Sequence, residues 1–468
     1  MNAAAVNGGA AKRAASAAWR PEFAALFSLG LPMALTQLAQ FSVMTIDILM
    51  IGRLGPEPLA GAALGLVMYF IAWLVGFGPA MAVSPLVSQA LGADENDTED
   101  ARHSTRMALW TIAFLTAPVF ILFLLAKDIA LALGQPPELA KLAGPYVIAL
   151  APGWAFAMGT ITLRNFLAAI GESRAPLMIV ICTTALNAFL NWLLIYGNWG
   201  FPRLELVGAG IASSIVNVTG FFALVLYIEV DARGRRFRLF RDFFTPHWLR
   251  LREVFGLSWP IAVAMTFEGM LFNAAVFLMG RIGVNEVAAY QVALNVAALA
   301  FMGPMGFSMA GGVRVGLAAG AGDGVRVRRA AALTMIVAIA AIMSVAIPVY
   351  LAPNFIAGLY LKADDADNAI VISIVASFLR IAALFMVFDA TQVAAAQALR
   401  GLKDVRLPMF ITGVAYWGVG FPVAALLGLG LGEWAGIGAN GVWWGLMAGL
   451  FVAAGLLGGR LYWLTRRR

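Results

Sequence analysis

Apolar residues run in long blocks along this chain, and polar or charged residues separate one block from the next. An α-helix needs about 20 predominantly apolar residues to cross roughly 30 Å of hydrocarbon. The blocks therefore predict an all-α polytopic membrane protein with twelve membrane-spanning helices. They fall at 24–52, 59–91, 104–126, 143–170, 175–197, 207–230, 254–280, 286–314, 329–351, 369–399, 407–429 and 437–464.

Composition agrees with a membrane protein and excludes a soluble globular one. Apolar residues make up 62% of the chain, charged residues only 12%, and the mean hydropathy is +0.85. A soluble domain carries about a quarter of its residues as charges. The single cysteine, Cys182, lies in an apolar block and has no intrachain disulfide partner. The Ala-rich, basic segment 1–21 has no apolar core, so we expect an unstructured tail rather than a cleaved signal peptide.

The distribution of basic residues predicts which way the helices cross the membrane. Twelve helices place both termini on one side, and the segments on that side carry 25 of the 32 Lys and Arg residues. Cytoplasmic loops are enriched in Lys and Arg. We therefore expect a multi-pass protein of the cell inner membrane with both termini in the cytoplasm.

The chain contains an internal repeat with an offset of 225 to 232 residues. Segment 27–55 matches segment 255–283, so that Pro32 falls on Pro260 and Gly52 on Gly280. Further matches, including Gly78–Pro79 on Gly303–Pro304, continue it along the chain. Each copy has six helices, so both copies enter the membrane from the same side, as in transporters built from parallel repeats.

The repeat predicts a division into two six-helix bundles. We expect an N-terminal lobe at 22–230, a basic cytoplasmic linker at 231–253, a C-terminal lobe at 254–464 and a basic tail at 465–468. Proline inside a membrane helix is tolerated and often kinks it. We assign Pro32 and Pro260 to the cleft between the lobes, as hinges.

Three acidic residues lie at membrane depth: Asp47, Glu268 and Asp389. A charged side chain at the centre of a membrane helix costs about 2.5 to 3.5 kcal/mol, so such residues mark functional sites by default. An apolar surrounding favours the neutral form of a carboxyl group, which lets it take up or release a proton, or hold a cation. The alternative is a neutral acid hydrogen-bonded to a backbone carbonyl.

Polar residues at helical spacing accompany these acids. Thr36 and Gln40 share a helix face with Asp47, and Asn187 and Asn191 lie one turn apart on the fifth helix. The acids of the second half have mostly apolar neighbours on their own helices. We expect their polar partners to be one another or two residues one turn apart on the eighth helix, Gln291 and Asn295. Gln392, one turn after Asp389, is a further supporting polar residue. Such amides also serve as hydrogen-bonding contacts between helices.

Aromatic and methionine side chains are dense near Glu268 and Asp389. An apolar, adaptable cavity with a few acids would suit a large, flat organic cation through burial and cation–π contact. Ordinary helix packing would explain many of the same residues, which are Phe267, Phe272, Phe277, Met302, Met305, Met309, Phe385 and Phe388.

Other chemistry has little support in the sequence. The two histidines fall in predicted loops, and the aspartates at 364, 365 and 367 fit a solvated turn, so we predict no metal site and no cofactor. The phosphate-binding motif GxxxxGK[ST] is absent, which argues against direct coupling to ATP. An intramembrane enzyme would need a nucleophile or metal motif at membrane depth. We expect no enzyme and no nucleic-acid partner.

Six stretches give the chain a resemblance to the multidrug and toxic compound extrusion (MATE) family, NorM-like branch, over about residues 22–460. They are QLAQFSVMTIDILMIGRLG, SQALGA, NAFLNWLLIYG, FEGMLFNAAVFLMGRIG, VAAYQVALN and FLRIAALFMVFDATQVAAAQALRGLKDVRLP. The resemblance implies a V-shaped pair of six-helix bundles that exports cationic or amphipathic compounds against inflow of H⁺ or Na⁺. It places Asp47, with Asn187 and Asn191 nearby, at an N-lobe cation or proton site. Glu268 and Asp389 would form the C-lobe coupling site.

We expect a secondary active antiporter with alternating access, a monomer in the bilayer, with small organic cations as substrates. H⁺ is the favoured coupling ion and Na⁺ the alternative. A lipid-linked saccharide flippase of related fold is the second interpretation; it would predict a cationic cleft, more helices and no Glu268–Asp389 pair. A passive channel would instead show flux without a driving gradient.

Overall fold

The computed structural model describes residues 3–360, 366–430 and 434–467, most of them in long helices. Two of the aspartates discussed above, at 364 and 365, lie outside the described residues. The helices are α1 (Ala3–Gly52), α2 (Pro56–Ala93), α3 (Thr98–Leu124), α4 (Ala126–Ala132), α5 (Pro137–Ala169), α6 (Arg174–Tyr196), η1 (Asn198–Gly200), α7 (Glu205–Val230), α8 (Ala232–Arg235), α9 (Trp248–Ile282), α10 (Val284–Gly320), α11 (Gly324–Leu351), α12 (Pro353–Tyr360), α13 (Ala366–Gly401), α14 (Arg406–Gly413), η2 (Val414–Gly420), α15 (Phe421–Leu429) and α16 (Ala439–Arg466).

Twelve segments of the described chain are long and apolar enough to cross a membrane, which confirms the predicted number. The eleventh, Arg406–Leu429, consists of α14, the π-helical segment η2 and α15 in succession. Many large apolar side chains face outward, among them Leu49 at 64% exposure and Phe410 at 61%. Such a surface suits contact with lipid rather than water.

Local sequence explains where several helices begin. Proline occupies the first turn of α2 and of α5, where its missing N–H costs no hydrogen bond. Asp97 caps α3 by accepting a hydrogen bond from the backbone N–H of Asp100, at 3.0 Å. Asp323 caps α11 in the same way, accepting from the N–H of Arg326 at 2.9 Å. The two caps occupy matching places in the two halves of the chain.

The N-terminal segment differs from the expectation. We expected an unstructured tail through residue 21, whereas α1 begins at Ala3 and continues without a break to Gly52. The segment is rich in alanine, which has the highest helix propensity, so it extends the membrane helix instead of ending it.

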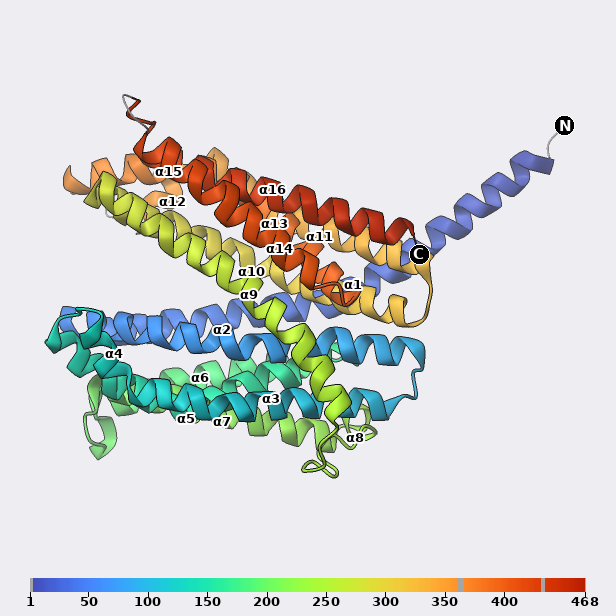
Figure 1. The fold of residues 1–468 in the computed structure, drawn as a ribbon, viewed down its shortest axis with the longest axis horizontal. Helices are drawn as coiled ribbons and strands as arrows, with labels where there is room; N and C mark the ends of the chain where they lie inside the picture. The colour runs from blue at the N-terminus through green and yellow to red at the C-terminus, as the bar shows by residue number, and fades with distance from the viewer. Residues whose placement is uncertain (1–2, 361–365, 431–433, 468) are drawn as a thin grey trace. The chain divides into compact units, whose positions relative to one another are not determined.

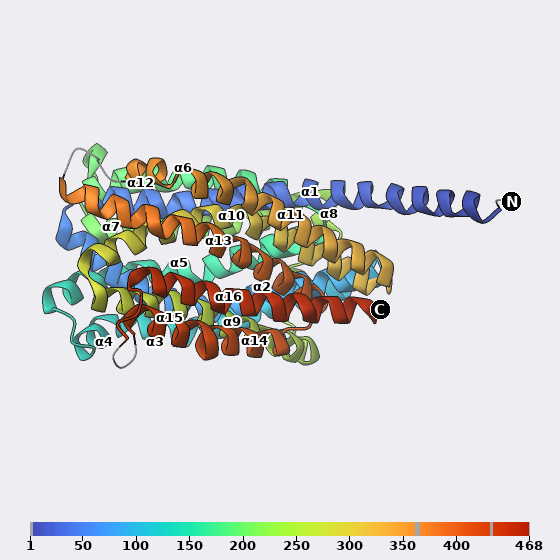
Figure 2. The ribbon, with the colours of Figure 1, turned by 90° about the horizontal axis from the view of Figure 1, so that it is seen from above.

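The contacts of the chain group it into two compact units. The N-unit is Leu35–Thr266, and the C-unit is Met1–Ala34 together with Phe267–Arg468. Within each unit the long helices run side by side (Figures 1 and 2). Both boundaries fall inside a helix, α1 or α9, because the first part of each helix packs in the unit built mainly from the other half of the chain. The division into lobes at 22–230 and 254–464 stays a prediction about the two sequence halves.

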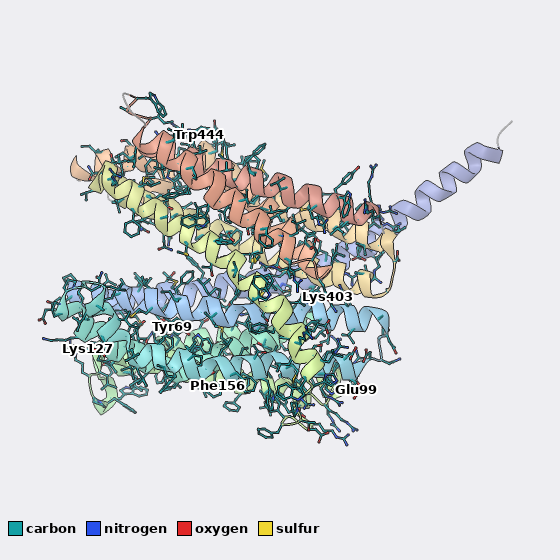
Figure 3. The ribbon with its side chains drawn as sticks, viewed as in Figure 1. Tyr69, Glu99, Lys127, Phe156, Lys403 and Trp444 are labelled. Carbon is teal, nitrogen blue, oxygen red and sulfur yellow. The ribbon has the colours of Figure 1, made fainter. Side chains whose placement is uncertain are left out.

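Each unit has its own apolar core. In the N-unit, Trp154 and Met158 of α5 are fully buried in a cluster with residues of α2 and α3. In the C-unit, Trp443 of α16 and Phe385 of α13 lie in a larger cluster that also includes residues of α9 and α10. Two charged side chains of the N-unit, Lys127 and Glu99, lie at opposite ends of its helices (Figure 3).

The structure refines the repeat at one position. Gly55 precedes α2 and Gly283 precedes α10, and both helices continue unbroken, so the offset of 228 persists along them. Gly78 therefore corresponds to Gly306 and not to Gly303. The packing agrees with this correspondence. A Cβ added at Gly78 would lie 3.2 Å from the Cβ of Ala262, and a Cβ added at Gly306 would overlap the backbone of Ala34. Ala34 and Ala262 are themselves equivalent positions of the repeat.

Candidate functional site

The N-unit brings Asp47 of α1 together with two asparagines of α6. Asn191 Nδ2 donates to Asp47 Oδ1 at 2.5 Å and to Asn187 Oδ1 at 3.2 Å. Both asparagine side chains are fully buried. Because residues i and i+4 share a helix face, their spacing on α6 points both amides at the same carboxyl group. The structure therefore brings together the three residues that the sequence placed at this site.

A fourth residue completes this group, and sequence reasoning missed it. Ser213 of α7 donates from its hydroxyl to Asp47 Oδ2 at 3.4 Å. The only sequence signal was a pair of serines within an apolar helix. Among the described residues, Asn187 Nδ2 and Asn191 Oδ1 are buried without a hydrogen-bond partner.

The remaining polar residues predicted on α1 lie apart from this group. Thr36 is buried, and Gln40 is exposed on the same helix. The hydrogen-bonding groups around Asp47 come instead from α6 and α7. Gln37, which the sequence did not single out, accepts a hydrogen bond from Arg164 of α5 at 3.0 Å.

The C-unit brings Glu268 of α9 together with Asp389 of α13. Gln392, one turn after Asp389, extends Nε2 to within 3.4 Å of both Glu268 Oε1 and Asp389 Oδ1. Gln392 and Asp389 are buried, and Glu268 is half-buried. One amide therefore bridges the two carboxyl groups.

Two further residues lie near this pair, and sequence reasoning missed both. Arg400, near the end of α13, interacts with the charge of Glu268. Tyr416 of η2 is fully buried and interacts with the charges of both acids. Its hydroxyl has no hydrogen-bond partner among the described residues. A tyrosine inside an otherwise apolar helix was the available sequence signal.

The segment that carries Tyr416 packs directly on α9. Trp417 Nε1 donates to the backbone oxygen of Phe267 at 3.2 Å, and a Cβ at Gly413 would lie 2.9 Å from the Phe267 ring. Single π-helical turns occur often at functional sites, because the extra residue redirects side chains. Here the turn lies beside Glu268.

The eighth-span residues do not join the acids. Gln291 and Asn295 of α10 are exposed, and within the described chain neither forms a hydrogen bond to Glu268 or Asp389. Asn295 Oδ1 instead accepts a bond from the Tyr360 hydroxyl at 3.0 Å. The expectation that α10 supplies polar partners to the acids is therefore not met in this structure.

The aromatic and methionine residues divide between core and surface. Phe385 packs edge-on against Phe272 and Trp443, with ring centroids 5.9 Å and 5.5 Å away, and belongs to the C-unit core. Phe277 is 78% exposed. Met305 is buried, and its sulfur atom lies 3.9 Å from Gln397 Nε2. Packing thus accounts for part of this set, as the alternative interpretation held.

The prolines assigned as hinges both lie inside helices near the boundary between units. Pro32 is in α1, shortly before the boundary at Ala34, and Pro260 is in α9, shortly before the boundary at Thr266. Across the described residues, no group of three or more His, Cys, Asp or Glu side chains is arranged to hold a metal ion.

The fold and the two acid groups are those of a polytopic membrane transporter. The eukaryotic MATE transporter AtDTX14 matches this chain with a TM-score of 0.84 at 23% identity, over 95% of this chain and 96% of its own. At that identity the match shows the shared fold.

Sequence comparison gives the family. A family model described as MatE matches residues 32–193 and 260–426, one match in each half. The probable multidrug resistance protein NorM of Mesorhizobium japonicum is 38% identical over 98% of this chain and 97% of its own length. The multidrug resistance protein NorM of Burkholderia vietnamiensis is 37% identical over 93% of each. The chain belongs to the MATE family, whose members are membrane transporters and not enzymes.

Proposed function

We propose that this protein is a secondary active multidrug efflux antiporter, which exports cationic or amphipathic organic compounds in exchange for H⁺ by alternating access. The observation that carries the proposal is the pairing of Glu268 with Asp389 through one buried amide, in a protein that holds a second acid group at Asp47. The relatives' names supply the substrate class.

The electrostatics of the C-unit site support exchange of a proton. Glu268 and Asp389 share the amide donor of Gln392. When both carboxyl groups are ionised they repel one another, and burial strengthens that repulsion. Binding one proton relieves that repulsion, so the pair can accept a proton at one stage of a cycle and release it at another. Organic cations would compete for the same negative charge.

The contacts favour H⁺ over Na⁺ as the coupling ion. A sodium site needs several oxygen ligands, as other hard cations do. The group placed between Glu268 and Asp389 is the Nε2 donor of Gln392, which cannot ligate a cation. Na⁺ is the alternative ion, and the experiment below tests both.

The bias of basic residues supports a location in the inner membrane with both termini in the cytoplasm. Each acid group is completed by residues of a single chain, so a monomer suffices for the proposed cycle. Two observations speak against the alternative of a saccharide flippase. A flippase would lack the Glu268–Asp389 pair, which is present here, and the relatives are named as drug-resistance proteins.

The test is ethidium transport in proteoliposomes driven by an imposed pH gradient or, separately, by an imposed Na⁺ gradient. We expect the wild type to follow the pH gradient. Asp47→Asn and the double variant Glu268→Gln, Asp389→Asn should each lower gradient-driven transport by at least tenfold, because neither can exchange a proton at the altered site.

Asp128→Asn is the matched control, because that acid lies in the short helix α4, outside both sites. Gradient-driven transport that survives both sets of substitutions would contradict the assignment of the acids. Transport that follows only the Na⁺ gradient would contradict H⁺ as the coupling ion. Equal flux with and without a gradient would indicate a channel.

A further inference from the structure

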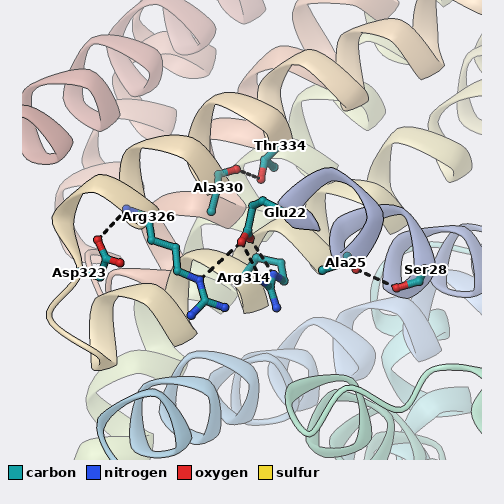
Figure 4. Close-up of polar contacts among 8 residues, drawn as sticks. All are labelled: Glu22, Ala25, Ser28, Arg314, Asp323, Arg326, Ala330 and Thr334. Carbon is teal, nitrogen blue, oxygen red and sulfur yellow. Dashed lines mark hydrogen bonds and ion pairs between the residues drawn. The ribbon is translucent and has the colours of Figure 1, made fainter. Parts of the chain in front are cut away.

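Glu22 lies in the first part of α1 and is buried in a cluster of arginines from the C-unit. Its Oε1 accepts a hydrogen bond from Arg314 Nε and its Oε2 one from Arg314 Nη2, both at 2.7 Å. Arg326 Nε approaches Oε2 at 3.5 Å (Figure 4). The Glu22 side chain is only 8% exposed. This two-pronged geometry is the strong form of an Arg–carboxylate pair, and it attaches α1 to α10 and α11.

Arg250 lies in the first part of α9 and forms the corresponding cluster in the N-unit. Its Nη2 forms an ion pair with Asp100 near the start of α3. Its Nη1 donates to Glu253 Oε2, one turn further along α9, at 2.6 Å. This cluster attaches α9 to α3.

The two clusters occupy matching positions of the internal repeat. Glu22 and Arg250 are 228 residues apart, the offset that relates α1 to α9. Asp100 and Arg326 are 226 residues apart, and each is the third residue after the aspartate that caps its helix. The ion pairs Glu22–Arg326 and Arg250–Asp100 are therefore repeat equivalents.

The signs of the charges are reversed between the two clusters. Position 22 is acidic and its equivalent at 250 is basic, while position 326 is basic and its equivalent at 100 is acidic. Were each helix to pack against its own half of the chain, Glu22 would face Asp100, and Arg250 would face Arg326. Both would be like-charge contacts, which are unfavourable. In the observed arrangement, the first segment of each of these helices packs against the other half of the chain. Both contacts, Glu22–Arg326 and Arg250–Asp100, then join opposite charges.

From this reversal we propose that Glu22 with Arg314 and Arg326, and Arg250 with Asp100, form two charge-reversed latches. The latches hold the first segment of α1 in the C-unit and the first segment of α9 in the N-unit. They release when the protein opens toward the cytoplasm. In the proposed orientation, the first segment of α1 and the first segment of α9 each precede their membrane crossing on the cytoplasmic side. The release step rests on the proposed function, whereas the latch itself does not.

The division of each helix between units supports release. The covalent path from one unit to the other runs through α1 and through α9, and a proline lies close before each boundary. Any movement of one unit against the other therefore strains these two helices. A bend near Pro32 or Pro260 can absorb part of that movement, but a first segment held by a buried ion pair cannot change its contacts until the pair opens.

The first test measures the latch in purified protein, without transport. Hydrogen–deuterium exchange of residues 19–34 should become at least fivefold faster in Glu22→Gln, because the amide cannot hold both arginines. The charge-reversed double variant Glu22→Arg, Arg314→Glu should return exchange toward the wild-type rate. Glu99→Gln is the control, since that exposed side chain pairs with Arg102 on its own helix. Unchanged exchange in Glu22→Gln would overturn the latch.

The second test asks whether the latch must open. In a Cys182→Ser background, Glu22→Cys and Arg314→Cys are joined by a reducible bis-methanethiosulfonate crosslinker, which replaces the ion pair with a covalent link. Ethidium transport should fall at least tenfold when crosslinked and recover on reduction. Full transport by the crosslinked protein would overturn release. A wild type without gradient-driven transport would instead contradict the proposed function, and the exchange result would still decide the latch.

Discussion

At the scale of residues, each acid group has an amide as its direct partner. Asn191 donates to Asp47, and Gln392 lies between Glu268 and Asp389. A lysine or arginine in direct contact would hold a carboxylate permanently ionised, whereas an amide donor stabilises the charge only in part. Carboxyl groups with amide partners can therefore change their protonation state, as the proposed exchange of H⁺ requires.

Removal of the amide beside Asp47 should weaken transport. Asn191→Ala deletes a hydrogen bond to a charged group, worth about 1.5–3 kcal/mol, which corresponds to a fall of roughly ten- to a hundredfold in ethidium transport. Asn198→Ala is the matched control, because its amide bonds the backbone oxygen of Trp192, outside the site. Equal transport by the two variants would argue against a role for Asn191.

Tyr416 offers a test that separates function from folding. Tyr416→Phe removes a hydroxyl that has no partner among the described residues, so the thermal midpoint of unfolding should stay close to that of the wild type. Transport should fall severalfold and its dependence on pH should change, because the hydroxyl lies within electrostatic reach of both acids.

Tyr290→Phe is the control for Tyr416. It removes a hydroxyl that donates to the backbone oxygen of Phe272 at 3.1 Å, so it should lower stability more than Tyr416→Phe does. Its pH profile should match the wild type. An unchanged pH profile in Tyr416→Phe would show that this hydroxyl takes no part in proton exchange.

At the scale of elements, glycines let α16 approach the interrupted eleventh span. Gly441, Gly445 and Gly449 recur every four residues, and they face Leu427, Ala424 and Gly420 respectively. Small residues at this spacing allow close packing between membrane helices. This packing holds α15 and η2 in place, and with them Tyr416.

A methyl group added to this stripe should destabilise the protein. A Cβ at Gly445 would overlap the backbone of Ala424, which cannot move without moving α15. Gly445→Ala should therefore cost about 1–3 kcal/mol by overpacking, seen as a lower thermal midpoint in detergent. Gly455→Ala, on the same helix with nothing within 4 Å of its Cβ, should leave the midpoint unchanged. Equal midpoints in both variants would contradict the packing argument.

At the scale of the whole molecule, the repeat and the charge bias determine the topology that we propose. Twelve spans place both termini on one side, and the basic loops choose the cytoplasm. The segment from α8 to the start of α9 then lies in the cytoplasm, where Arg106 of α3 donates to the backbone oxygen of Thr245 at 2.8 Å and anchors it.

Cysteine labelling in spheroplasts would test this orientation. In a Cys182→Ser background, Gln135→Cys lies between α4 and α5 and should react with a membrane-impermeant maleimide in intact spheroplasts. Arg235→Cys, at the end of α8, should react only after permeabilisation. Both positions are exposed in the structure. The reverse pattern would mean that the termini lie outside the cytoplasm.

The sequence by itself determined the features that depend on local pattern. Long apolar blocks predicted the twelve spans, because hydrocarbon requires every backbone hydrogen bond to be made within a helix. Helical spacing predicted that Asn187 and Asn191 would face together, and the cost of burying charge singled out Asp47, Glu268 and Asp389.

Only the tertiary structure decided which helices supply the partners. Ser213, which donates to Asp47, and Tyr416, which lies near Glu268 and Asp389, come from other spans, and no local pattern encodes the packing that places them. Gln291 and Asn295 had suitable spacing, but α10 presents them elsewhere. The exchange of first segments between the halves was equally hidden. The charges at 22 and 250 were visible in the sequence, but their meaning depends on which helices they meet, and long-range packing decides that.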